Sequence, residues 1–375
     1  MSKTIIDIHV LQTVPPSNIN RDDTGSPKQA QYGGVARSRV SSQAWKRATR
    51  KAFEETLDPA ELGVRTKRIV ELIAGKITRQ RVDLADDSLT IAEKALKKGG
   101  FVVEKPRPAK GSTTEPVAES KFLLFLSDQQ ISNIASLAIE GNDGGEFDGS
   151  AIKKAADQAH SVDLALFGRM VADAVDLNVD AAAQVAHAIS VHAVENEFDY
   201  FTAVDDKKPD DASGAGMIGT VEFNSSTLYR YATVNVNGLL SNLGSVDATS
   251  RAVGAFVHAF ITSMPTGKQN TFANRTLPEG VVVVVRDSQS VNLVGAFEDA
   301  VAAGEGESRV QIASEKLADY ATEIERNYGV GSVASYVLQV GPYTRGLIAL
   351  GTPTSLSDMV TALESLTSER LQEPA

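Results

Sequence analysis

The amino-acid sequence predicts an α+β fold, and three patterns indicate it. Side chains alternate in character from Ile6 to Leu11, which is typical of a strand. Residues 57–180 have mainly helical apolar spacing. Val281–Val285 is a run of five valines, as in a buried strand. With 375 residues, 42% of them hydrophobic, the chain can form one large core or two smaller ones.

The composition excludes several kinds of site. The chain has no cysteine, so disulfides, thiolate zinc sites and cysteine nucleophiles are excluded. No run of residues approaches the roughly 20 apolar residues of a membrane span. The N-terminal residues MSKTIIDIHVLQTV lack a small-residue cleavage site, so they predict a strand and not a signal peptide. We therefore expect a cytoplasmic protein without membrane contact, and we expect neither a cofactor nor a bound metal.

The first strand is followed by a polar segment. Ile6, Ile8 and Val10 point to one side of the strand, so at least that face is expected to be buried. The segment from Pro15 to about Arg39 is polar and contains glycine, and we interpret it as a loop.

A helix with a basic face is predicted after this loop. Ser41 or Ser42 can cap it, because a serine hydroxyl accepts a free backbone N–H of the first turn. Trp45 and Phe53 are the expected core anchors. One face of the helix carries four polar or basic residues at helical spacing: Gln43, Lys46, Arg47 and Arg50.

The next part of the chain predicts a helical insertion. Arg68–Ile77 and Leu89–Leu96 have the apolar spacing of helices. Ser127 and Gln130 form a capping-box pattern ahead of another helix. The basic, proline-containing segment Lys105–Ser112 is expected to be a loop.

The second half returns to strands. We expect a strand near Val185–Val191, where several alanines leave a helix open as the alternative, and a second strand over Ser226–Val236. The polar, turn-rich residues DDKKPDDASGAGMIG of a long hairpin separate the two. Further elements follow in order: a helix at Ala248–Ser263, the valine strand, and helices near Val310–Arg326 and Ser355–Leu371. Without the insertion and the hairpin, the order is βαββαβ, which is the ferredoxin-like order shared by many RNA-recognition modules.

Positive charge is concentrated in one stretch. Thr24–Phe53 carries seven basic residues and no acidic residue, whereas the whole chain has a formal net charge of -11. The remaining 345 residues therefore sum to -18. A solvated surface helix is the ordinary explanation for such charge, but no acid is interleaved here to form i,i+4 pairs. The helix start also offers free N–H groups to an anion, so phosphate binding is favoured.

Other candidate sites are weaker. Asp22 and Asp23 in the Asn20–Asp23 segment could hold a magnesium ion, although adjacent acids in loops more often form turns. His187 and His192 are five residues apart, which does not place them on one face of a strand or a helix, so structural roles are favoured over a metal pair. No glycine-rich phosphate loop followed by Lys-Ser/Thr is present.

The long hairpin has apolar residues on both sides of its polar tip. These residues could pack beneath the loop. Alternatively, they could form a protruding arm that separates bases or docks on a neighbour. They are Tyr200, Phe201, Val204, Met217 and Ile218.

Taken together, these segments closely resemble the CasC family, the CRISPR-RNA-binding backbone subunit of type I-E Cascade complexes. The resemblance covers most of the chain and is looser from about 57 to 160. It is carried by IDIHVLQTVPPSNINRDD, GGVARSRVSSQAWKRATRK, VDLALFGRM, AHAISVHAVENEFDYFTAVDD, GTVEFNSSTLYRYATVNVN and PTGKQNTFANRTLP.

The resemblance implies a hand-shaped protein that is not an enzyme. An RRM-like palm would comprise residues 1–56 and 181–375, helical fingers residues 57–180, and a thumb residues 196–222. Copies would form a helical filament on the guide RNA, and each thumb would reach the neighbouring copy and displace a nucleotide. The exposed bases would pair with a target DNA strand in antiviral defence, because base pairing reads the sequence in RNA-guided systems. Other Cascade subunits and a recruited helicase-nuclease would be the further partners.

The resemblance also implies roles for individual residues. Met170 would pack beside the displaced nucleotide. Related backbone subunits of type III systems cut target RNA with a loop aspartate, so a metal-dependent endoribonuclease using Asp22 or Asp23 stays open as the alternative. The residues expected to contact RNA are Asn20, Arg21, Lys28, Ser41, Ser42, Gln43, Lys46, Arg47, Arg50, Gly168, Arg169, Met170, Lys268 and Gln269.

Overall fold

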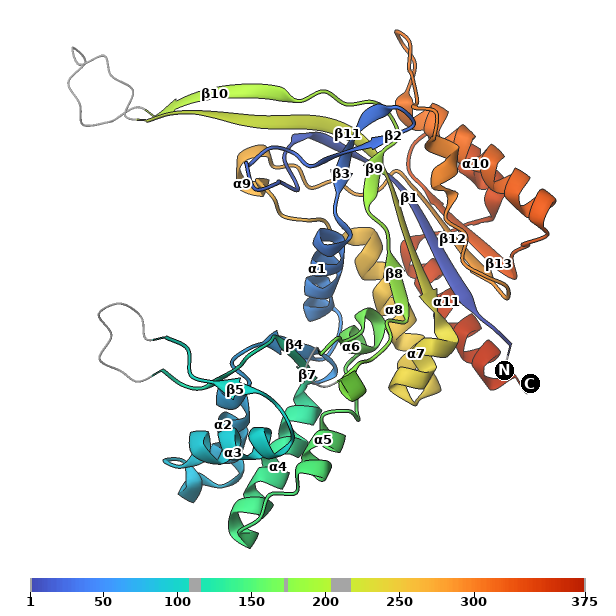
Figure 1. Cartoon of the computed structure of the whole chain (residues 1–375). Coiled ribbons are helices and arrows are strands. Elements are labelled where there is room, and N and C mark those ends of the chain that lie inside the picture. The colour runs from blue at the N-terminus through green and yellow to red at the C-terminus, as the bar shows by residue number, and fades with distance from the viewer. Residues whose placement is uncertain (1, 108–115, 172–174, 204–216, 374–375) are drawn as a thin grey trace, which may run out of the picture. The chain divides into compact units, whose positions relative to one another are not determined.

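A computed structural model describes residues 2–107, 116–171, 175–203 and 217–373 (Figure 1). The chain forms two compact units. The sheet unit comprises Met1–Ala52, Gln184–Asn235 and Val253–Ala375, and the helical unit comprises Phe53–Ala183 and Val236–Ala252. The predicted α+β class is confirmed, with a large central sheet and packed helices. No helix within the described ranges is both long enough and apolar enough to cross a membrane.

The sheet is built around β1 (Ile5–Ser17). This strand pairs antiparallel with β11 (Met217–Asn235) on one side and with β12 (Gly280–Arg286) on the other. The strand order is β14-β13-β12-β1-β11-β9-β3-β2, and β8 and β10 pair with β11 outside this path. The remaining bounds are β2 Gln29–Tyr32, β3 Val35–Val40, β8 Ala183–Val185, β9 Ala188–Ser190, β10 Glu197–Ala203, β13 Ala334–Gln339 and β14 Thr352–Pro353.

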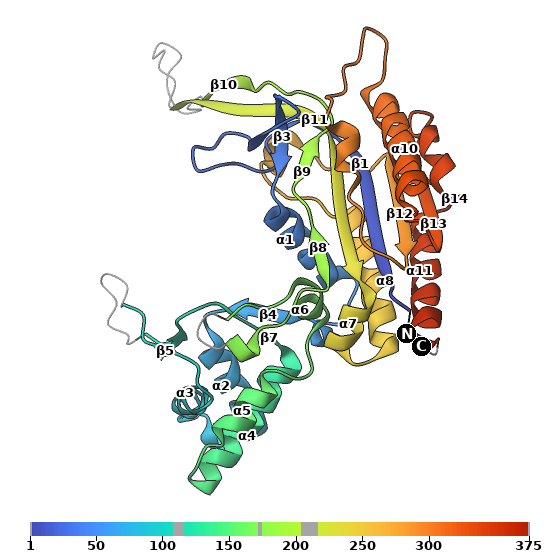
Figure 2. The ribbon, with the colours of Figure 1, turned by 45° about the vertical axis from the view of Figure 1, so that its right-hand side comes forward.

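Helices cover both faces of the sheet. On the face of Leu11, β1 and β12 pack under α10 (Arg309–Tyr328), η5 (Leu293–Phe297) and η6 (Arg345–Leu350). The opposite face, which carries Ile6 and Ile8, is covered by α1 (Ser42–Ala52), α8 (Val246–Thr262) and α11 (Leu356–Gln372). Both chain ends lie side by side at the end of α11 (Figure 2), where Ser2 Oγ donates to Glu373 Oε2.

The prediction of a loop from Pro15 to about Arg39 is confirmed for residues 18–28 and wrong on either side of them. β1 extends to Ser17, and β2 and β3 form a hairpin whose two-residue turn is Gly33-Gly34. Both glycines have positive φ, +59° and +79°, as this kind of turn requires. A Cβ on Gly33 would also lie 1.7 Å from the carbonyl oxygen of Glu298. The Gly-Gly pair was therefore the missed signal for a hairpin in an otherwise polar stretch.

The face of β1 that carries Asp7, His9 and Leu11 is buried, although two of these residues are polar. Asp7 is fully buried and accepts hydrogen bonds from the hydroxyl of Tyr231 (2.8 Å) and from Nε of Arg286 (3.2 Å). His9 is 1% exposed, and its Nδ1 lies 2.9 Å from the Tyr229 hydroxyl. This buried polar network joins β1, β11 and β12, and most of its buried polar groups are paired, although Nε2 of His9 has no hydrogen-bond partner among the described residues.

The network predicts acid sensitivity of the fold. Burial, and secondly the Arg286 charge, lowers the pKa of His9 to about 3. Below pH 6.5 the unfolded chain therefore binds a proton at His9 and the folded chain does not, so the free energy of unfolding falls as the pH drops. The contribution of His9 is about 1.4 kcal/mol per pH unit, or about 2 kcal/mol between pH 6.5 and 5. Burial raises the pKa of Asp7. As pH falls towards the ordinary value of an aspartate, the folded chain therefore takes up this proton before the unfolded chain does, and the free energy of unfolding rises.

Urea unfolding at pH 7 and pH 5 tests this expectation. His9→Gln keeps a polar partner for Tyr229 and removes the ionisable ring, so the variant should lose less stability on acidification than the wild type. Some dependence should remain, since burial also lowers the pKa of His160 and His192. An equal loss in both proteins would contradict the assignment.

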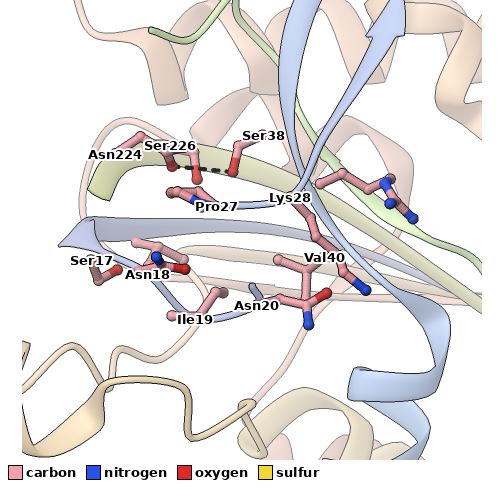
Figure 3. Close-up of a pocket in the computed structure, with 12 residues that line it drawn as sticks. Ser17, Asn18, Ile19, Asn20, Pro27, Lys28, Ser38, Val40, Asn224 and Ser226 are labelled. Atoms are coloured by element: carbon pink, nitrogen blue, oxygen red, sulfur yellow. Dashed lines mark hydrogen bonds between the residues drawn. The ribbon is translucent and has the colours of Figure 1, made fainter. Parts of the chain in front are cut away.

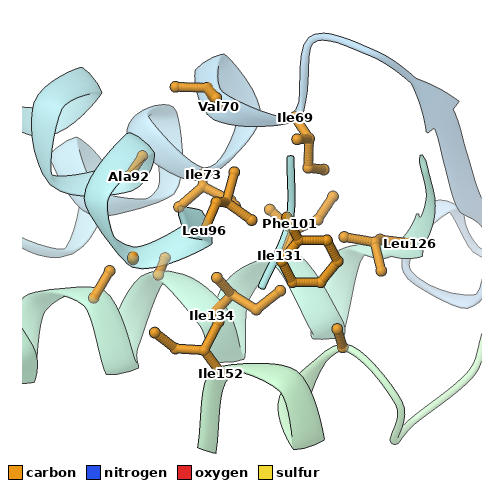
Figure 4. Packing of buried hydrophobic residues seen from close by; sticks show 14 of the residues in the cluster. Ile69, Val70, Ile73, Ala92, Leu96, Phe101, Leu126, Ile131, Ile134 and Ile152 are labelled. Atoms are coloured by element: carbon orange, nitrogen blue, oxygen red, sulfur yellow. The ribbon is translucent and has the colours of Figure 1, made fainter. Parts of the chain in front are cut away.

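The helical unit has its own apolar core. Ile73, Leu96, Ile134, Ile152 and Phe101 converge in it (Figure 4). The predicted capping box is confirmed: the backbone N–H of Gln130 donates to Ser127 Oγ, and that of Ser127 donates to Gln130 Oε1. The helices are α2 Ile69–Gln80, α3 Ser88–Lys98, α4 Asp128–Gly144, α5 Gly149–Ala155, α6 Val162–Phe167 and α7 Val236–Leu243.

Short strands also occur in this unit, where the sequence predicted mainly helices. β4 (Gly63–Thr66) pairs with β7 (Leu124–Ser127), and β5 (Val103–Glu104) pairs with β6 (Glu119–Ser120). Pairs of two to four residues leave little periodic signal, and their partners are distant in the sequence.

Candidate nucleic-acid interface

The predicted basic helix begins where the serines placed it. The backbone N–H of Ala44 donates to Ser41 Oγ (3.3 Å), and α1 runs from Ser42. The N–H of Ser41 donates in turn to Oδ1 of Asn20 (2.9 Å), which ties the preceding loop to the helix start. Asn20 therefore positions the first turn of α1 as well as lining the same surface.

The faces of α1 are divided as the helical spacing predicted. Trp45 is 1% exposed and Thr49 is fully buried, so this side faces the core. On the remaining surface Gln43 and Arg47 are exposed, while Lys46 and Arg50 are half-buried. Partial burial lowers the pKa of Lys46.

A buried arginine anchors α1 to the sheet. The guanidinium carbon of Arg230, on β11, lies 3.8 Å from the centroid of the Trp45 ring and 4.6 Å from that of Phe260 on α8. Its Nη1 donates to Gln12 Oε1 of β1 (2.6 Å). Burial lowers the pKa of Arg230 to about 9, so the side chain still carries charge at neutral pH and is held between the two rings. The basic face of α1 thus has a rigid base.

The loop before β2 lies next to α1 and lines a narrow pocket with Lys28 and Val40 (Figure 3). Asn18 is buried in its wall, and its Nδ2 donates to the carbonyl oxygens of Gly25 (3.0 Å) and Glu222 (2.9 Å). Arg21 is exposed and Lys28 is half-buried. The loop therefore presents these two cations on a backbone that is held to β11.

Asp22 forms a turn within this loop. Its Oδ1 accepts from the hydroxyl (2.7 Å) and the N–H (2.9 Å) of Thr24 and from the N–H of Ser26 (3.0 Å). These bonds, with the Thr24 hydroxyl first, lower the pKa of Asp22. Asp23 is exposed. Among the described residues, no group of three or more His, Asp or Glu side chains is placed to hold a metal ion.

A second loop comes from far along the chain. A Cβ on Gly267 would lie 2.3 Å from the carbonyl oxygen of Ile19, so the two loops are in backbone contact. Lys268 and Gln269 follow directly, half-buried, and α9 (Gln269–Phe272) begins there. Lys268 and Gln269 are thereby brought beside the Asn20–Arg21 loop.

Gly267→Ala is expected to displace this second loop. The added methyl group should destabilise the fold by about 1–3 kcal/mol, as overpacking does. It should also weaken RNA binding by about tenfold, which corresponds to one lost charge-assisted hydrogen bond. Thermal unfolding and RNA titration measure the two effects. Gly331→Ala is the matched control, since a Cβ there meets no atom within 4 Å. Equal behaviour of the two variants would contradict the role of the close contact.

The hairpin of β10 and β11 extends beyond the other strands (Figures 1 and 2). Tyr200 and Phe201, two of the apolar residues predicted for base displacement, point to opposite faces of the hairpin because they are consecutive in a strand. Phe201 lies across Gly219 of the paired strand, where a Cβ would come within 2.5 Å of the ring, and Phe201 is 37% exposed. Tyr200 is 64% exposed on the other face, together with Phe198 at 67%. Phe198 was missed by the sequence analysis, although its period-two spacing from Tyr200 was the available signal.

For the other predicted residues of this hairpin, the structure gives the strand pairing of Met217 and Ile218 only. Met217 and Ile218 pair with Ala203 and Thr202 across the two strands. Val204 lies outside the described residues.

An amide network holds the base of the hairpin. Oδ1 of Asn196 accepts from Nε2 of Gln29 (2.9 Å) and from Nδ2 of Asn224 (3.1 Å). Nδ2 of Asn196 donates to Glu222 Oε2 (3.0 Å). These bonds connect β2, in the basic segment, with β11 and with the residue that precedes β10. Only tertiary pairing could reveal them.

Gly168, Arg169 and Met170 belong to the helical unit. Met170 is 85% exposed. Arg169 is 6% exposed, and its guanidinium donates to the carbonyl oxygens of Leu177 (2.7 Å) and Ala156 (2.9 Å). We therefore correct the expectation for Arg169 to a structural role, because its donors are used inside the protein. Gly168 has φ +76°, and Met170 stays a predicted RNA contact.

Comparison with known proteins identifies chains that are similar to this one. The family model described as "CT1975-like protein" matches residues 6–362. A solved structure titled "CRISPR RNA-guided surveillance complex, pre-nicking" contains a chain that is 33% identical, with a TM-score of 0.84 over 97% of this chain and 100% of the other. A second, titled "CRISPR RNA-guided surveillance complex", is 29% identical, with a TM-score of 0.72 over 96% and 99%. No curated protein matches.

The family match extends over more than half of the chain, and the similarity to a surveillance-complex chain is nearly end to end. The chain therefore belongs to the CT1975-like family of CRISPR-associated proteins, as its resemblance to the CasC family predicted.

Proposed function

We propose that this chain is the CRISPR-RNA-binding backbone subunit of a type I-E Cascade surveillance complex. The observation that carries the proposal is the gathering of three segments on one side of the sheet unit. The loop with Asn20 and Arg21, the first turn of α1 and the loop with Lys268 are joined through Asn20 and Gly267. They present cations and amide groups, which suit a phosphate backbone, on an otherwise acidic protein.

In this proposal the sheet unit acts as an RRM-like palm, the helical unit as fingers and the β10–β11 hairpin as a thumb. The sheet order β12-β1-β11-β9, with α1 and α8 on one face, supports the palm assignment. Copies of the protein form a helical filament along the guide spacer and present it to target DNA. Other Cascade subunits complete the complex, and a helicase-nuclease recruited by it degrades the target.

Isolation from cells that contain a CRISPR array tests the proposed function. The purified protein should carry discrete small RNA that contains spacer sequence. The Lys46→Ala, Arg50→Ala double variant should carry much less. Wild-type protein that is isolated without RNA, or with RNA of random length and sequence, would contradict the proposal.

We further propose that the subunit is not an enzyme. The bonds of Asp22 to Thr24 and Ser26 support a turn-forming role for this carboxylate. Target RNA and target DNA should stay intact when incubated with protein, guide and magnesium. Regularly spaced, metal-dependent cuts that disappear in Asp22→Ala or Asp23→Ala would establish the endoribonuclease alternative instead.

A further inference from the structure

His187 is an exposed histidine between β8 and β9, beside the first turn of α1. Its Nδ1 lies 3.3 Å from the backbone nitrogen of Ser42 and 3.3 Å from Nη1 of Arg39. Both of these atoms carry hydrogens, so Nδ1 is the acceptor. The proton of the neutral ring is therefore on Nε2.

The surroundings keep this ring neutral. The partial loss of water around the ring, followed by the charges of Arg39 and Lys28, lowers the pKa of His187. A proton on Nδ1 would also face the hydrogens of Ser42 and Arg39 and break both bonds. His187 is thus a neutral ring with a fixed tautomer, unlike the two basic side chains beside it.

The opposite edge of the ring is available. Within the described part of the chain, Nε2 of His187 has no hydrogen-bond partner. Arg39 is held in place by its bond to His187 and by donation from Nε to the carbonyl oxygen of Gln29 (3.2 Å). His187 is exposed and feels the positive charges of Arg39 and Lys28, so an N–H donor on its ring matches an anionic oxygen.

We propose that His187 is a further RNA-binding residue, whose Nε2–H donates to a non-bridging phosphate oxygen of the guide. The inference rests on the proposed function and adds a neutral donor to its cations. The sequence analysis favoured a structural role for this residue. The geometry assigns it two tasks: Nδ1 organises Arg39 and the start of α1, and Nε2 contacts the RNA.

Two substitutions separate the tasks. Asparagine places its Oδ1 near the position of Nδ1, so His187→Asn keeps the acceptor and lacks a donor at Nε2. Glutamine places an amide nitrogen near the position of Nε2. We expect His187→Asn to weaken guide binding by about tenfold at unchanged thermal stability, and His187→Gln to recover most of that loss.

The salt dependence of binding is the second readout. A neutral donor releases no counterion, so His187→Asn should leave the salt slope unchanged, whereas loss of a cationic contact lowers it by about 0.7. Wild-type affinity in His187→Asn would overturn the contact, and a reduced slope would overturn the neutral donor. Both of these outcomes concern the variant alone and are compatible with guide binding by the wild type. Failure of the wild type to bind guide RNA would instead overturn the proposed function itself.

Discussion

Replacing Lys46 and Arg50 together with alanine is expected to weaken guide-RNA binding by about 100-fold, because each charge-assisted hydrogen bond contributes about 1.5 kcal/mol or more. Both side chains lie half-buried on the α1 surface that Trp45 and Thr49 leave open. The loss should be similar for any guide sequence, since phosphate contacts carry little sequence information. Each lost contact should also lower the salt slope by about 0.7 for single-stranded RNA.

Arg326→Ala with Arg345→Ala is the matched control for this double variant. It removes the same charge from exposed positions at α10 and η6, which cover the other face of the sheet. Titrations at several salt concentrations compare the two proteins. If the α1 variant keeps wild-type affinity and slope, or if both variants lose equally, α1 is not the RNA-binding surface.

Replacing Phe198 and Tyr200 with serine is expected to prevent copies of the protein from assembling on the guide. The two aromatic rings are mainly exposed on one face of the hairpin, so the fold should be unaffected. Burying such rings against a neighbour or a displaced base contributes about 2 kcal/mol each. Their joint loss should lower the assembly constant by about 1000-fold. Sedimentation measures assembly. The nucleotides that the thumbs displace should be chemically reactive at regular intervals in the wild-type assembly, and footprinting of the guide shows whether this pattern disappears in the variant.

The control for the hairpin is Tyr328→Ser with Tyr343→Ser. These tyrosines are 74% and 53% exposed and lie at the end of α10 and after β13. Their replacement removes a comparable area of exposed aromatic side chain outside the hairpin. Assembly with an unchanged periodic footprint in Phe198→Ser, Tyr200→Ser would show that this face of the hairpin does not displace nucleotides. Phe201→Ser should act differently, by loosening the contact with Gly219.

Much of the secondary structure followed from local patterns. α10 and α11 lie within a few residues of the ranges that apolar spacing predicted. The hydroxyl of Ser41 and the pair Ser127–Gln130 marked helix starts correctly. The strands β2 and β3 were mistaken for loop because they are short and polar, and because they are stabilised by pairing with each other and, for β3, with β9.

The sequence by itself determined the α+β class, the basic face of α1 and the membership in a family, because each depends on residues that are close together or on a pattern along the chain. Tertiary structure alone decided which charged residues are available. Arg37 and Arg169 are basic in sequence, but both are buried. Arg37 donates to the carbonyl oxygens of Ser190 and Phe297, and Arg169 donates to that of Phe125, 44 residues away. His187 acquires a fixed tautomer only where Ser42 and Arg39 meet it. Local periodicity reports which face a side chain occupies, whereas the partner across that face is set by packing between remote parts of the chain.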